Sequence, residues 1–108
     1  MIEIRQYIDR SGRTPFARWF DKLDDSAQAR VTVYLDRLER GNDSAAKGIG
    51  GGLQELRLDF GPGYRIYFGK DGERLVILLG GGTKRRQQAD IDRALALWEE
   101  YKQQKREE

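Results

Sequence analysis

The stretch Leu53–Phe68, LQELRLDFGPGYRIYF, decides the fold. Two segments of alternating apolar and polar residues flank Gly61-Pro62-Gly63, which is the pattern of a β-hairpin closed by a three-residue loop. Pairing Phe60 with Tyr64 places six apolar side chains on one face of this hairpin. They are predicted to face the core: Leu56, Leu58, Phe60, Tyr64, Ile66 and Phe68.

The same pairing gathers polar side chains on the opposite face of the hairpin. Arg57 is then opposite Tyr67, Asp59 is opposite Arg65, and Glu55 shares their face. Opposed side chains of paired strands lie about 5 Å apart at Cβ, so these five residues would form one cluster. We expect a polar sheet face here. Two interpretations stay open: a catalytic surface, or a solvated face on which the charges only pair with one another.

The chain after the hairpin predicts a central strand and a closing helix. Leu75–Leu79 is a continuous apolar run, typical of a strand that is covered on both faces. Gly80–Gly82 at its end indicate a bulge or a close approach of other groups. Asp90 is predicted to cap a last helix, which ends in a polar, fraying tail. The apolar stripe of that helix is Ile91, Ala94, Leu95 and Trp98.

The chain before the hairpin predicts a strand and two helices. Residues 2–8 alternate as a strand does, Thr14-Pro15 opens a short helix to Leu23, and Ser26 caps a longer helix that stops near Gly41. Residues 43–52 are predicted to be a loop. The order β-α-α-β-β-β-α describes a single α+β domain over residues 1–108, with a small, mostly antiparallel sheet and a helical hairpin against it.

Composition excludes several kinds of chemistry. The chain has no cysteine and no histidine, which removes disulfides, thiol nucleophiles, zinc–thiolate sites and the usual general base. No apolar run approaches the roughly 18 residues that span a bilayer, and the N-terminus lacks the apolar region of a signal peptide. We therefore expect a cytoplasmic protein whose chemistry uses Lys, Arg, Tyr, Asp, Glu, Ser or Thr.

Positive charge is concentrated in the middle of the chain. Residues 43–86 carry eight basic and five acidic side chains, a balance of +3, and end in Lys84-Arg85-Arg86. The formal net charge of the whole chain is only +2. A local positive patch of this kind suits a polyanionic partner, although it also serves solubility.

The hairpin sequence also resembles a known group of proteins. Gly52–Phe68, followed by Leu79–Lys84 and by Gln87, Asp90, Ile91 and Ala94, resembles the signature of the RelE/ParE toxin superfamily. The likeness is greatest to the HigB-like branch, often called addiction module killer proteins. The helix start at Thr14-Pro15-Phe16 fits the same branch, so the resemblance covers nearly the whole chain.

This resemblance implies a toxin of a type II toxin–antitoxin module. Many such toxins are endoribonucleases that cut mRNA, usually in the ribosomal A site, and need no metal or other cofactor. A cognate antitoxin, commonly a helix-turn-helix DNA-binding protein, neutralises them by direct binding. Operator DNA would be contacted only through that antitoxin, and no membrane partner is implied.

The resemblance also implies roles for individual residues. Arg65 matches the hairpin arginine that contacts the scissile phosphate, Arg57 matches a basic position on the preceding strand, and Lys84 falls where a basic residue lies near the leaving oxygen. Lys84 is therefore the candidate general acid. Glu55 or Tyr67 is the candidate base or water-positioning group. The candidate RNA-binding residues are Lys47, Arg85 and Arg86.

One departure from the nuclease branch leaves two other functions open beside RNA cleavage. The nuclease branch often carries a C-terminal Tyr or His near the chemistry, whereas this chain has no histidine, and Trp98 and Tyr101 fall on a predicted helix. The ParE branch inhibits DNA gyrase, which would depend on the helices rather than on Arg65. A third possibility is an inactive toxin that binds only its antitoxin or DNA.

Overall fold

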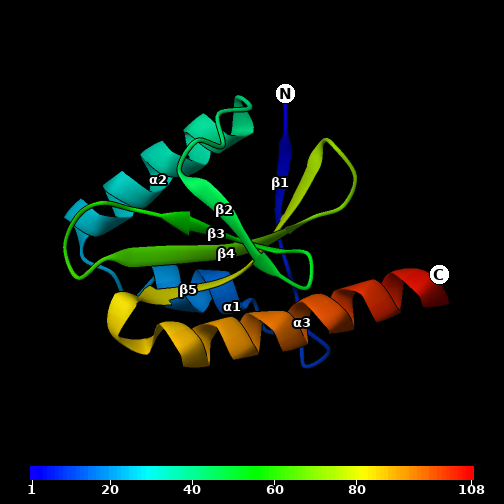
Figure 1. The fold of residues 1–108 in the computed structure, drawn as a ribbon. Coiled ribbons are helices and arrows are strands. Elements are labelled where there is room, and N and C mark those ends of the chain that lie inside the picture. The colour runs from blue at the N-terminus through cyan, green and yellow to red at the C-terminus, as the bar shows by residue number, and fades with distance from the viewer.

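The computed structural model describes residues 1–108 and contains one five-stranded sheet (Figure 1). The strands lie in the order β1-β5-β4-β3-β2; β1 is parallel to β5, and the other neighbours are antiparallel. The α+β prediction is confirmed, with one strand more than expected. The elements are β1 (Glu3–Gln6), α1 (Pro15–Phe20), α2 (Asp25–Glu39), β2 (Ala46–Gly50), β3 (Leu53–Arg57), β4 (Tyr64–Lys70), β5 (Leu75–Thr83), the 3-10 turn η1 (Lys84–Arg86) and α3 (Gln87–Glu107).

Helices cover both faces of the sheet. Phe16 of α1 and Val31 and Leu38 of α2 pack on one face, against the apolar side of the hairpin. Ala94 and Trp98 of α3 pack on the other face. Figure 1 shows α2 and α3 on opposite sides of the strands. No helix is both long and apolar enough to cross a membrane.

The predicted polar sheet face exists, but it is covered by a helix instead of facing solvent. The face that carries Glu55, Arg65 and Tyr67 lies under α3, and all three residues are buried. The apolar run of β5 explains the extra layer, because Ile77 and Leu79 project to this face and need a cover. The prediction that residues 75–79 form a strand covered on both faces is confirmed. The bulge predicted at the end of this strand is also confirmed, and it lies between the pairs Tyr67–Gly80 and Phe68–Leu78.

The hairpin register differs from the expected one by two residues. Arg57 pairs with Arg65 and Glu55 with Tyr67, so Asp59 is outside the strands, in a loop longer than the predicted Gly61-Pro62-Gly63. A shift of two residues keeps every side chain on its predicted face. The apolar face is accordingly confirmed, while the predicted opposition of Arg57 to Tyr67 and of Asp59 to Arg65 is wrong.

Residues 43–52 are not only a loop, as predicted, because they contain β2. The segment Ala46–Gly50 has little intrinsic strand propensity, but it pairs with β3, and Lys47 is opposite Glu55. Backbone hydrogen bonds to β3 therefore stabilise this strand, although its side chains do not favour one. Lys47 is thereby placed on a strand beside the charged cluster.

Several helix boundaries also differ from the predictions. Asp24, rather than Ser26, caps α2 by accepting a hydrogen bond from the Ala27 amide at 2.8 Å. Helix α1 ends at Phe20, short of Leu23. Helix α3 begins at Gln87, so Asp90 lies inside its first turn, and the helix continues through the polar tail to Glu107. The stop at Gly41 is confirmed, with φ at +92°.

Candidate functional site

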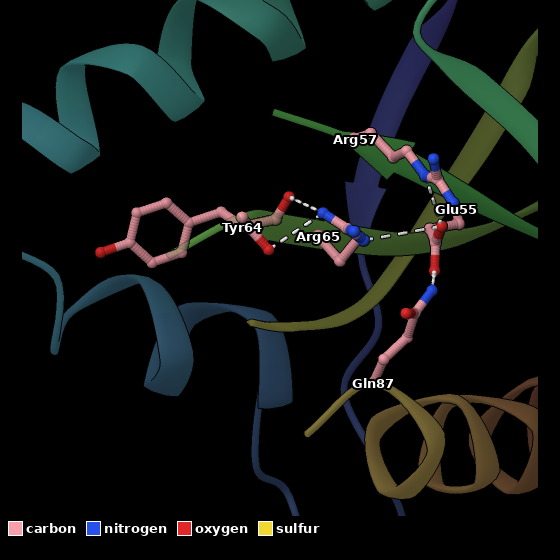
Figure 2. A network of polar contacts seen from close by, with 6 residues as sticks. Glu55, Arg57, Tyr64, Arg65 and Gln87 are labelled. Atoms are coloured by element: carbon pink, nitrogen blue, oxygen red, sulfur yellow. Dashed lines mark hydrogen bonds and ion pairs between the residues drawn. The ribbon is translucent and has the colours of Figure 1, made fainter. Parts of the chain in front are cut away.

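The centre of the charged cluster is a buried carboxylate on β3. Glu55 is 0% exposed, yet it has three polar neighbours. Its Oε1 lies 3.2 Å from Arg57 Nε and 3.7 Å from Arg65 Nε, and its Oε2 accepts a hydrogen bond from Gln87 Nε2 at 2.6 Å. Figure 2 shows the two arginines and Gln87 converging on this side chain from three elements. A buried charge is tolerated when it is paired and hydrogen-bonded in this way.

Backbone carbonyls hold one end of the Arg65 guanidinium, and at the other end its Nε faces Glu55 at ion-pair distance without a hydrogen bond. Arg65 is 7% exposed; its Nη1 donates to the Gly63 carbonyl at 3.0 Å and to the Tyr64 carbonyl at 3.4 Å. Gly63 has φ at +75°, and a Cβ there would come within 3.3 Å of Arg65 Nη1 and 3.2 Å of Lys84 Cβ. Glycine at this position therefore allows both basic residues to approach the loop closely.

Lys84 and Arg57 are the accessible cations of the cluster. Lys84 begins η1, where its amide donates to the Gly63 carbonyl at 2.9 Å and its side chain is exposed. The Arg57 side chain is 46% exposed although its Nε faces Glu55. An anion that approaches the Gly63 loop would thus meet Lys84, and the buried Arg65 lies between the loop and Glu55, which the exposed Arg57 also contacts.

Tyr67 is on the same sheet face as the arginines, two residues after Arg65 on β4 and opposite Glu55. It is 1% exposed, and its hydroxyl has no hydrogen-bond partner in the structure. Burial, and secondly the charge of Glu55, raise the pKa of Tyr67 well above that of a free tyrosine. The phenol is therefore a neutral group near pH 7, suited to donating a proton in a hydrogen bond rather than to accepting one as a base.

The three residues predicted to bind RNA are exposed but do not form one patch. Lys47 lies on β2 directly opposite Glu55, on the far side of the hairpin from η1. Arg85 and Arg86 follow Lys84 in η1, and Arg86 faces a groove on the other side of β5. Gln87 belongs to the stretch that resembles the toxin signature, but no role at the site was predicted for it, because its contact with Glu55 depends on how α3 packs.

The groove has a volume of about 530 Å³ and lies between α1, α3 and the glycine-rich end of β5. Its walls carry five basic side chains, Arg13, Arg18, Lys22, Arg86 and Arg93, against the two acids Asp9 and Asp90. Tyr67 also lines it. Four of the five cations were missed by the sequence reasoning because they are scattered along the chain and meet only through the packing of α1 and α3.

Comparison with known proteins gives the family. Residues 18–99 match the sequence profile of the family described as phage derived protein Gp49-like (DUF891). The chain belongs to this family. Gp49-like proteins are a RelE/ParE-like toxin family of addiction modules, so the predicted resemblance is confirmed at the level of the superfamily. The small α+β fold with its five-stranded sheet agrees with that assignment.

A relative of the Gp49-like protein occurs in Haemophilus influenzae. The two sequences are 41% identical over 86 residues, which cover 79% of this chain and 87% of the relative, itself described as an uncharacterized protein. Membership of a toxin–antitoxin family implies an antitoxin partner for this chain.

Proposed function

We propose that this protein is a HigB-like toxin that cuts mRNA on the ribosome without a metal ion. The observation that carries the proposal is the convergence of Arg57 and Arg65 on one buried carboxylate, with Lys84 across Gly63. This arrangement fixes Arg57 and Arg65 beside one carboxylate, and the exposed Lys84 lies across Gly63 from Arg65. Preorganised cations are what the charge of a phosphoryl transition state requires.

The reaction is an intramolecular transesterification at one phosphodiester of the RNA chain. The 2′-oxygen of one nucleotide bonds to the adjacent phosphorus, and the bond from phosphorus to the 5′-oxygen breaks. The proton of the 2′-hydroxyl passes to a base, and the departing 5′-oxygen takes up a proton from an acid. The products are a 2′,3′-cyclic phosphate and a 5′-hydroxyl end.

The burial of each residue suggests how these tasks are divided. Arg57, whose side chain is 46% exposed, holds the phosphate oxygens, because a guanidinium is planar and always charged, and the buried Arg65 adds positive charge behind it. Lys84, being exposed beside the same loop, protonates the leaving oxygen. Glu55 is enclosed by Arg57, Arg65 and Gln87, which favours a positioning role for the arginines. The raised pKa of Tyr67 supports a hydrogen-bond donor rather than a base.

The other cations extend the contact with RNA. Lys47 lies on the β2 side of the cluster, and Arg85 and Arg86 lie beyond Lys84. Together they would contact phosphates on either side of the cleaved bond, and they add no sequence preference by themselves. The antitoxin, a helix-turn-helix protein in this proposal, would neutralise the toxin in the cytoplasm and carry the complex to operator DNA.

The test is expression of the protein without its antitoxin, followed by mapping of mRNA 5′ ends early after induction. The proposal expects new 5′ ends in frame within coding regions. Those ends should be absent in cells that express Arg57→Ala and present with Arg74→Ala, an exposed control on the β4–β5 turn. Growth arrest with intact mRNA and broken chromosomal DNA would point instead to gyrase inhibition. Soluble protein without arrest would point to a binding module.

A further inference from the structure

Strand β1 is an edge of the sheet, and its outer side has no partner. It pairs with β5 alone. The Tyr7 amide donates to the Leu78 carbonyl of β5 at 3.0 Å, so the backbone groups of residues 3, 5 and 7 face β5. Because successive residues of a strand direct their backbone groups to opposite sides, the N–H and C=O of Ile4 and Gln6 point outward. No other segment forms a backbone hydrogen bond with them.

The side chains along this edge do not repel a second strand. Like charges or a proline would keep one away. Strand β1 has no proline, and its two charges, on Glu3 and Arg5, have opposite signs and share one face of the sheet. Both side chains are largely exposed, at 58% and 62%. The chain has three exposed large apolar residues, and two of them, Met1 and Ile8, flank this strand.

The sequence of β1 is complementary to itself. In an antiparallel pair centred on Ile4, each Ile4 is opposite the other, and each Glu3 is opposite Arg5 of the second copy. The backbone of Ile4 faces outward, so the central residues exchange both N–H···O=C bonds. The Glu3–Arg5 pairs are then of the non-hydrogen-bonded type, in which opposed side chains lie closest. A centre one residue later would place Arg5 opposite Arg5, which is destabilising.

We propose that two copies of this protein associate through β1, which pairs antiparallel with its counterpart about Ile4 and joins the two sheets into one. An exposed strand edge is a template for a further strand. Four charges of alternating sign then lie side by side across the dimer axis. The Ile2 amide keeps its bond to the Glu39 carbonyl at 2.8 Å, and the Ile2 carbonyl accepts from the Gln6 amide of the second copy.

A second copy fits this edge because a twofold axis satisfies both charges at once. In such an interface the contact of Glu3 with Arg5 is repeated as the contact of Arg5 with Glu3. Two short strands bury less than the roughly 1,200 Å² of stable complexes, so the dimer should be weak and depend on protein concentration. Neither Arg57 nor Lys84 takes part, and the proposal stands apart from the proposed nuclease activity.

Sedimentation equilibrium of the full-length protein, between about 10 μM and about 1 mM, measures the association. The average mass of the wild type should rise from that of a monomer toward that of a dimer. Glu3→Arg and Arg5→Glu should each weaken the association at least tenfold, because four like charges then face one another. Asp43→Arg is the control and should leave the association unchanged, since it reverses one charge of the exposed pair with Lys70, away from β1.

Mixing the two variants separates lost pairing from misfolding. An equimolar mixture of Glu3→Arg and Arg5→Glu should associate at least as strongly as the wild type, because one β1 then carries only positive charges and the other only negative ones.

Hydrogen exchange locates the interface. The amides of Ile4 and Gln6 should exchange at least twofold more slowly at about 1 mM than at about 10 μM, whereas the Gly72 amide, in the exposed β4–β5 turn, should not change. A wild type that stays monomeric at about 1 mM overturns the proposal. A dimer that tolerates both charge reversals, a mixture that does not recover association, or unchanged exchange at Ile4 and Gln6 overturns it as well.

Discussion

Arg57 and Arg65 are directly opposite each other on neighbouring antiparallel strands, and the Nε of each faces the same oxygen of Glu55. Like charges in opposed positions of a sheet are destabilising on their own. The Glu55 carboxylate compensates for both and orients both guanidinium groups. The cationic site and the stability of the hairpin therefore depend on one buried acid.

Substitution of this acid should destabilise the fold. Glu55→Gln keeps the shape of the side chain but leaves two opposed arginines without their counter-charge, one of them buried. Loss of one partner of a buried ion pair typically costs roughly 3 kcal/mol or more of unfolding free energy. Urea denaturation measures it. Glu3→Gln is the matched control, because its pair with Arg5 is exposed and should contribute under about 1 kcal/mol. Equal effects of the two substitutions would contradict a central role for Glu55.

Lys84 should act through its proton as well as its charge. If it is the general acid, both Lys84→Ala and Lys84→Arg lower the rate of RNA cleavage, by about 10²-fold or more, since arginine retains the charge but does not release a proton near neutral pH. The exposed side chain predicts almost no change in thermal stability. A Lys84→Arg variant with the wild-type rate would restrict Lys84 to electrostatic contact.

Helix α3 packs closely on the sheet at Gly69, where the absence of a side chain leaves room for the Trp98 indole. A Cβ there would lie about 2.5 Å from the Trp98 indole, so Gly69→Ala forces the ring or the helix to move. Overpacking of this kind costs about 1–3 kcal/mol. Gly48→Ala is the control, because its added Cβ would meet only Gln54 Nε2 at 3.7 Å. Thermal denaturation distinguishes them, and equal melting temperatures would show that α3 is not packed as described.

The Tyr101 hydroxyl links the C-terminal half of α3 to the β4–β5 turn. This contact should make the free energy of unfolding sensitive to alkaline pH. The Tyr101 hydroxyl donates to Asp71 Oδ2 at 2.5 Å, and burial together with this bond raises the pKa of Tyr101 to about 12. A pKa raised on folding favours the protonated folded state below the ordinary value of 10.0. The associated stabilisation is complete below pH 10 and is lost as pH rises through about 12.

Tyr101→Phe tests this dependence. The variant should be less stable than the wild type by about 1.5 kcal/mol at pH 7, the usual magnitude for a hydrogen bond to a charged group. The difference should stay constant up to pH 10 and shrink between pH 10 and 12. A difference that persists undiminished to pH 12 would mean that the hydroxyl contributes nothing that depends on its proton.

Sequence patterns predicted well which side chains face the core, because these alternate along a strand. They predicted poorly the features that depend on backbone hydrogen bonds alone. The period of two placed Leu56 and Ile66 on the core face, and a register error of two residues did not disturb this. Loop length is less well specified, so the opposition of Arg57 to Arg65 was missed. Strand β2 was missed because its pairing with β3 depends on backbone groups that any residue possesses.

The burial of the charged face could have been anticipated from the chain itself. The apolar run of β5 already required cover on both faces, and the stripe with Ala94 and Trp98 was the available cover. Placing that helix over Glu55 would have predicted a buried carboxylate. The cationic groove is different, because Arg18 and Arg93 come together only when two distant helices pack on the same strand.

The most direct test of the account is cleavage of a ribosome-bound message by purified protein. Ribosomes with a defined mRNA and an empty A site are mixed with the wild type, Arg57→Ala or Arg74→Ala, and the RNA ends are mapped. We predict one cut in the A-site codon, with a 5′-hydroxyl on the downstream fragment. The wild type and Arg74→Ala make this cut, and Arg57→Ala slows it about 10²-fold or more. Intact message with folded wild-type protein, or equal cleavage by Arg57→Ala, would contradict it.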